Sequence, residues 1–197
     1  MSSSAYLQFL PVFNFAYQIT DRGSRADENI SFWTPAVPPG WWWLGMFPTN
    51  TYGPPAGPAF VTQAVNDVPS SPLLKAPTGL TQIWTCTGDN QVNNLGIYSL
   101  RAPPGYIGIG IIAVSNFGVP PQVADFPTLM CVRQDQCRKA HVSGRVWDDR
   151  GSAAPSDINV FMLPNARVAF AVVQDGYQKS AEFWDLVIPP TSSDVTD

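Results

Sequence analysis

Short apolar runs separated by polar, proline- and glycine-containing turns dominate the chain. Runs such as "NLGIYSL" (94–100) and "GYIGIGIIAV" (105–114) are rich in β-branched and aromatic residues. This pattern is typical of β-strands. Only "QKSAEFWDLV" (178–187) has some helical spacing, and a strand is equally compatible with it. The pattern therefore predicts an all-β protein built from short strands.

The apolar and turn positions recur along the chain. The stretch 19–49 aligns without a gap with 84–114, which lies 65 residues later. The matching positions are Gly23 with Gly88, Phe32-Trp33 with Ile97-Tyr98, "PPG" (38–40) with "PPG" (103–105), and Gly45 with Gly110. A weaker third copy begins near residue 146, where Trp147 falls on Trp84 and Gly151 on Gly88. Such a period indicates repeated supersecondary units.

These repeats predict the domain organisation. We expect one domain over residues 1–197, with copies at about 13–65, 80–133 and 142–190 and a disordered tail at 191–197. A unit of about four short strands leaves one face unburied, so three units packed about a common axis bury those faces against one another. The expected fold is a β-prism of three antiparallel sheets with pseudo-threefold symmetry.

Composition narrows the possible partners. The net charge is −4 with 11 Lys and Arg, so a basic face for nucleic acid is not expected. The first residues lack the pattern of a secretory signal, and no run of about 18 apolar residues occurs. We therefore expect a protein of the cytoplasm, or one released without a signal peptide. The sequence says nothing about the oligomeric state.

The residues that most often perform catalysis or hold metals are sparse. His141 is the one histidine, and no nucleophile motif, phosphate-binding loop or dinucleotide fingerprint accompanies it. Cys86, Cys131 and Cys137 are expected to be reduced thiols, although Cys131 and Cys137 can pair in an oxidising space. We expect no enzyme activity, no cofactor and no metal site, and a hydrolase ranks third among the possible functions.

The PPG segments resemble a known family. "ISFWTPAVPPGWWWLG" (30–45) and "LGIYSLRAPPGYIGIGIIAV" (95–114) are similar to the repeated motif of the vacuolar protein sorting-associated protein 62 family, and "PTLMCVRQD" (127–135) is similar to the segment after its second motif. The resemblance implies a β-prism used for recognition, with links to membrane association. β-Prisms also include sugar-binding lectins and targeting domains of pore-forming toxins. The sugar loop of jacalin-type β-prisms has no clear match near 175–177, so that sugar chemistry does not carry over.

The run Trp41-Trp42-Trp43 departs from the family motif, which has one aromatic residue there. In a strand, Trp42 and Leu44 would face the core, while Trp41 and Trp43 would share the other face with Tyr106 of the second copy. Trp43 either packs under a loop or against the N-terminal segment "YLQFLPVFNF" (6–15), or belongs to a platform for a sugar or a lipid interface. Trp41, Trp43 and Tyr106 are candidate ligand-binding residues.

Polar loops centred on glycine occupy equivalent places in the three copies, at 20–29, 87–94 and 148–157. Their Asp and Asn side chains suit sugar hydroxyl groups, and equally suit ordinary turns. The candidate ligand-binding residues in these loops are Asp21, Asp89, Asn90, Asp148 and Asp149. Three related weak sites would favour a multivalent surface.

These observations favour a non-enzymatic module that binds a cell-surface glycan or a membrane lipid head group, in the manner of a lectin, a toxin or a defence protein. The alternative is a membrane-trafficking adaptor that binds proline-containing peptides along an exposed edge. A protein partner is therefore also possible, whereas nucleic acid is not expected.

Overall fold

Antiparallel strands make up nearly all the regular structure of the computed structural model, which describes residues 4–87, 94–152 and 154–187. Two short 3₁₀ segments complete it. The elements are β1 (Tyr6–Val12), β2 (Phe15–Thr20), β3 (Ser31–Pro35), β4 (Phe47–Thr49), β5 (Ala59–Val65), β6 (Leu74–Lys75), β7 (Gly79–Cys86), β8 (Leu95–Arg101), β9 (Tyr106–Ile107), β10 (Ile111–Val114), η1 (Val123–Asp125), β11 (Cys131–Arg133), η2 (Gln134–Gln136), β12 (Cys137–Ser143), β13 (Arg145–Asp148), β14 (Ile158–Met162), β15 (Ala169–Val173) and β16 (Ser180–Leu186).

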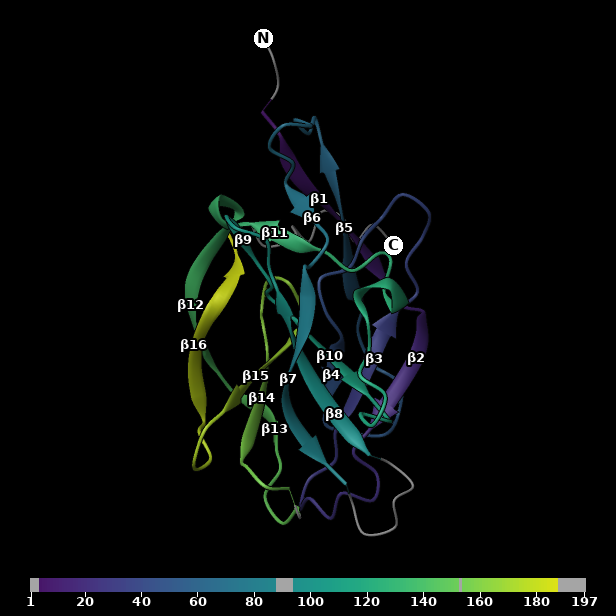
Figure 1. The fold of residues 1–197 in the computed structure, drawn as a ribbon, viewed down its shortest axis with the longest axis vertical. Coiled ribbons are helices and arrows are strands. Elements are labelled where there is room, and N and C mark those ends of the chain that lie inside the picture. The colour runs from purple at the N-terminus through teal and green to yellow at the C-terminus, as the bar shows by residue number, and fades with distance from the viewer. Residues whose placement is uncertain (1–3, 88–93, 153, 188–197) are drawn as a thin grey trace.

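Each third of the chain builds the same arrangement. An inner three-stranded sheet forms from β2-β3-β4, then from β7-β8-β10, then from β13-β14-β15. The strands that flank each inner sheet pair with one another: β1 with β5, β6 with β11 (which also pairs with β9), and β12 with β16. The fold is a three-sheet β-prism (Figure 1). The helical alternative for 178–187 is excluded, because β16 occupies most of that segment.

The burial pattern separates inner strands from outer ones. The central strand β14 ("INVFM") is buried over its first four residues, as expected for a strand covered on both faces. The outer strand β12 ("CRKAHVS") has few buried positions and exposes most of its polar residues. Continuous apolar runs therefore build the interior of the prism, and mixed runs build its outer ribbons.

Two tryptophans at matching positions of the second and third copies meet in the core. The rings of Trp84 and Trp147 lie 5.8 Å apart in an edge-to-face arrangement. Each indole N–H donates to a loop of another copy, from Trp84 to the carbonyl of Ser156 (2.7 Å) and from Trp147 to the carbonyl of Glu28 (2.8 Å). A buried tryptophan needs such a partner, and here the partner ties neighbouring copies together.

Gly45 and Gly110, the matched glycines after the PPG segments, face each other at the junction of the first two copies. A β-carbon on Gly45 would lie 2.6 Å from the Cα of Gly110, and one on Gly110 would overlap the carbonyl oxygen of Leu44. Main-chain hydrogen bonds continue this junction, from Met46 N–H to the Ile111 carbonyl (3.1 Å) and from Ala169 N–H to the Met46 carbonyl (2.7 Å). All three copies therefore meet through their backbones.

The three cysteines are free and buried. Burial raises the pKa of both Cys131 and Cys137 to about 12. In the described part of the chain, no helix is long and apolar enough to cross a membrane. Gly88 and the tail at 191–197 lie outside the described residues, so the symmetry expected for Gly88 and the disorder expected for the tail stay predictions.

Candidate functional site

Trp43 lies in the core, so of its two expected roles the exposed platform is not what the structure shows. Its side chain is 2% exposed and packs edge-to-face against Phe126, with ring centres 6.2 Å apart. The segment 41–44 is not a strand of the inner sheet. Its backbone bonds to Thr62 on one side, through Trp42, and to Thr128 on the other, through Trp43. Trp41 and Trp43 pack in one buried cluster and Leu44 in another, so neighbouring side chains still point to different sides, and protein covers both sides.

The other members of the expected aromatic platform are also engaged with the protein. Trp41 is half-buried and packs against the core, while Tyr106 is 9% exposed and its hydroxyl donates to the carbonyl of Pro72. Gly108, which aligns with Trp43, is required where it stands, because a β-carbon there would lie 2.7 Å from the Cβ of Leu100. The three aromatic residues form no common exposed surface.

Asp21 and Asp149 hold their own loops in the same way. The carboxylate of Asp149 accepts from the Ile158 N–H (2.9 Å) and from the Ser152 hydroxyl (3.0 Å). Asp21 accepts from the Ile30 N–H (3.0 Å) and the Ser24 hydroxyl (3.1 Å). Both carboxylates are 2% exposed, and burial raises the pKa of each. Their oxygens face the loop interior and not solvent.

The two loop-bonding aspartates share a sequence signal. The segments "DRGSRA" (21–26) and "DRGSAA" (149–154) are identical at five of six positions. Arg22 lies over the Tyr52 ring (4.6 Å) in the first loop, and Arg150 over the Tyr177 ring (4.7 Å) in the other. Burial, with the nearby carboxylates, raises the pKa of each tyrosine to about 12. The second copy places the buried Cys86 at the position of the aspartate.

The remaining loop candidates divide into two groups. Asp148 is 3% exposed and forms an ion pair with Arg145 (2.7 Å), so it also faces inward. Asp89 and Asn90 lie outside the described residues.

The first and third loops contact each other through the Asp27 N–H, which donates to the Arg150 carbonyl (2.7 Å). Figure 1 shows both loops at one end of the prism, away from β9 and β11.

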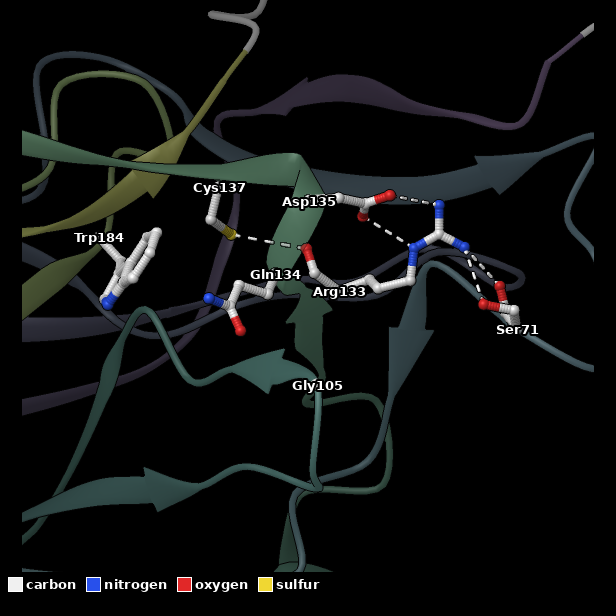
Figure 2. Close-up of a pocket in the computed structure, with 7 residues that line it drawn as sticks. All are labelled: Ser71, Gly105, Arg133, Gln134, Asp135, Cys137 and Trp184. Carbon is white, nitrogen blue, oxygen red and sulfur yellow. Dashed lines mark hydrogen bonds and ion pairs between the residues drawn. The ribbon is translucent and has the colours of Figure 1, made fainter.

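An open groove of about 850 Å³ lies near the opposite end, between the second and third copies (Figure 2). Its lining comes from the PPG turn, the end of β11, η2 and β16. The residues are Ser71, Gly105, Arg133, Gln134, Asp135, Cys137 and Trp184. Figure 2 shows Trp184 on one side and the polar cluster of Arg133, Asp135 and Ser71 on the other, with Gln134 between them.

Hydrogen bonds fix the polar wall of this groove. Arg133 binds both carboxylate oxygens of Asp135, through Nε (2.8 Å) and Nη2 (2.9 Å). Its Nη1 donates to the carbonyl of Ser71 (2.6 Å). The hydrogen bonds between Arg133 and Asp135 lower the pKa of Asp135 and raise the pKa of Arg133. A bidentate pair of this type holds both side chains in one geometry, so the wall is preorganised.

The opposite wall is aromatic. Trp184 is half-buried in β16, and the Lys139 ammonium lies 5.0 Å from its ring centre. Between the walls, Gln134 is exposed and can both donate and accept. The groove thus combines an aromatic side with a fixed carboxylate, a guanidinium and a free amide. Among the described residues, no cluster of His, Cys, Asp and Glu is placed to hold a metal ion.

Comparison with known proteins agrees with the repeated PPG segments and the three-sheet fold. The family model of vacuolar protein sorting-associated protein 62 matches residues 7–175. The chain belongs to this family. The resemblance inferred from the PPG segments is therefore confirmed. No curated protein matches the sequence significantly.

A solved structure with the same fold as this Vps62-family chain is the crystal structure of GNIP1Aa from Chromobacterium piscinae. The two align with a TM-score of 0.76 and 22% sequence identity over 95% of this chain. The chain spans 34% of the length of that protein. This likeness confirms the β-prism architecture. The family and the fold together fit a non-enzymatic recognition module.

A second depression in this Vps62-family prism lies between the first two copies and is mainly apolar, with a volume of about 340 Å³. Tyr17, Ile19, Val119, Pro120 and Phe126 are among its lining residues. Tyr17 and Val119 are 72% and 71% exposed. Neither depression has a contiguous sequence motif, because each is assembled from two copies.

Proposed function

We propose that this chain is a non-enzymatic recognition module that binds glycans of a cell surface in the groove beside Trp184. The observation that favours this proposal is the pairing of a half-buried indole with a fixed polar wall across an open groove. Ligand sites generally combine apolar or aromatic lining with a few placed polar groups.

The chemistry of the groove suits a sugar ring. A pyranose has an apolar face, which an indole can cover, and an edge of hydroxyl groups that need both donors and acceptors. Asp135 supplies acceptor oxygens, Arg133 has one Nη2 hydrogen left after its bonds to Asp135 and Ser71, and the Gln134 amide can both donate and accept. Because Arg133 already holds Asp135 in place, binding would order few further side chains, and this lowers the entropic cost of association.

The test is a glycan array followed by calorimetry with the strongest hit, comparing the wild type with Trp184→Ala. Loss of the indole should weaken binding at least tenfold. Tyr17→Ala is the matched control, because it removes an exposed aromatic residue from the other depression. Equal glycan affinity of the wild type and Trp184→Ala, with both folded, would reject this groove. Flotation with uncharged and anionic vesicles tests the lipid alternative on the same preparation.

The apolar depression beside Tyr17 supports a second candidate function, the binding of proline-containing peptides. Aromatic-lined grooves are the usual receptors of such peptides, and Tyr17 and Phe126 both line this one. Pulldown with proline-rich peptides should then fail for Tyr17→Ala and persist for Trp184→Ala. The two variants thus form a crossed pair in which each ligand class depends on a different residue.

A further inference from the structure

A third groove, of about 490 Å³, lies between the first and third copies. One wall comes from β4 and the loop at 50–58, and the other from β13 and the turn between β14 and β15. Its lining includes Asn50, Thr51 and Gly57 on the first side, and Arg145 and Arg167 on the other. No carboxylate lines it, although the chain as a whole has a net charge of −4.

Arg167 has an unusual environment for a cation. Its guanidinium lies 5.4 Å from the ring centre of Phe47 and 5.8 Å from that of Phe60. Its Nε is buried without a hydrogen-bond partner, and among the described residues no carboxylate forms an ion pair with it. Burial lowers the pKa of this group. A desolvated N–H without an acceptor is unfavourable.

The backbone at Arg167 adds to this picture. Its φ is +52°, in the left-handed region that a residue with a β-carbon seldom adopts. The turn is closed by the Arg167 N–H, which donates to the Leu163 carbonyl (2.9 Å). The side chain is therefore held in the groove by its turn and by the two phenylalanine rings.

Arg145 is the second guanidinium that lines the groove. It is paired with Asp148 through Nη2 (2.7 Å), and its Nη1 donates to the Gln178 carbonyl (3.3 Å), yet its Nε is buried without a partner. Asp148 is thus committed to Arg145 and does not neutralise Arg167. Of the two guanidinium groups in the groove, one is paired with a carboxylate and the other is not.

We propose that this groove binds a compact oxyanion, a phosphate or sulfate group, through the Nη end of Arg167. Guanidinium groups recognise such groups by two parallel hydrogen bonds. Gly57 leaves the approach open, because a β-carbon there would lie 3.0 Å from Nη2 of Arg167 and would contact no other residue within 4 Å. The proposal is independent of the glycan groove, which lies between the second and third copies.

The experiment measures calorimetric binding of inorganic phosphate, sulfate and glycerol phosphate at constant ionic strength, with chloride as the reference anion. Wild type should bind at least one of these oxyanions, and Arg167→Gln should weaken that binding at least tenfold. Arg138→Gln, which makes the same charge change at an exposed position of β12, should bind like the wild type. If Arg167→Gln fails to fold, Gly57→Val serves instead, because its side chain should cover Nη2 while φ at residue 57 needs no glycine.

Vesicles containing phosphatidic acid form the second arm and distinguish a lipid head group from a free oxyanion. Binding to vesicles but not to glycerol phosphate, lost in Arg167→Gln, assigns the groove to a lipid phosphate. Binding to both assigns it to the oxyanion itself. The proposal is overturned if the wild type binds none of these probes, or if Arg167→Gln and Arg138→Gln lose the same small amount of affinity.

Discussion

The two ends of the prism use aspartate in opposite ways. At the loop end, Asp149 is buried and accepts hydrogen bonds from its own loop. At the groove end, the side chain of Asp135 is 59% exposed and is held by Arg133. Burial raises the pKa of Asp149, while the hydrogen bonds from Arg133 lower that of Asp135. An acidic loop centred on a glycine is therefore not by itself a binding surface.

The difference follows from what the neighbouring backbone offers. A glycine turn with several free N–H groups needs an internal acceptor, and the loop aspartate supplies it. At the groove end, the β11–η2 connection leaves its polar side chains outside the ladder of β11, where Arg133 can fix them. At the loop end, the polar side chains satisfy hydrogen bonds of their own loop. At the groove end, the polar side chains remain accessible.

The largest effect is expected from Trp43→Gly, which tests whether any of the tryptophan run belongs to an exposed surface. Removing a core tryptophan should lower the free energy of unfolding by about 3–5 kcal/mol, because it leaves a cavity beside Phe126. Urea denaturation measures this loss. Trp41→Gly, at a half-buried position, is the control and should cost clearly less; equal losses would contradict the burial assigned to Trp43.

Asp149→Ala tests the loop end. It should lower the free energy of unfolding by about 2–4 kcal/mol, because the buried Ile158 N–H and Ser152 hydroxyl lose their acceptor. Asp149→Asn keeps an acceptor oxygen and should lose less. Thermal denaturation of the three proteins measures the ranking. If the stability of Asp149→Ala is close to that of the wild type, the hydrogen bonds of Asp149 have no structural role.

Asp135→Ala is the counterpart at the groove end. Exposed ion pairs contribute about 0.2–1 kcal/mol, so this variant should stay within about 1 kcal/mol of the wild type in the same denaturation assay. It should nevertheless weaken glycan binding, if the groove is the site. A loss of stability as large as that of Asp149→Ala would remove the contrast between the two ends.

The smallest effect is the pH dependence, which should have opposite signs at the two ends. Asp149 has a raised folded-state pKa, so its contribution to stability is full below the unfolded pKa near 3.8 and is lost as the pH rises through the folded value. Asp135 has a lowered pKa, so its contribution is present above 3.8 and is lost as the pH falls through the folded value. Carboxyl titration by NMR should place Asp149 above 3.8 and Asp135 below it. Shifts of the same sign would refute this assignment.

The sequence predicted the architecture because the repeats are defined by turn residues and apolar runs, which determine local structure. The PPG turns and the apolar runs specify local structure, Trp84 and Trp147 mark matching positions of two copies, and the family resemblance rests on the PPG segments. The prism and the family were therefore accessible before any coordinates. The expected repeat bounds of about 13–65, 80–133 and 142–190 stay a prediction.

The sites were less accessible, because they depend on contacts between copies. Alternation along a strand placed Trp43 on the face opposite Leu44 but left open what covers that face, and in the structure Phe126 packs against it. The direction of the Asp21 and Asp149 side chains depends on loop backbone N–H groups that composition does not show. Trp184 and Arg133 come together only when the second and third copies pack, and Arg167 meets Phe47 only across the first and third.

The contact between Gly45 and Gly110 has a consequence for how such a chain can change. Where two main chains touch, no gradual series of larger or smaller residues exists, because the first added carbon atom already collides. In duplicated units joined in this way, the sequence of the outer ribbons can diverge freely, while the residues at the main-chain contact cannot change. A single unit produced on its own would present bare amide groups there, and we expect it to aggregate or to associate with further copies.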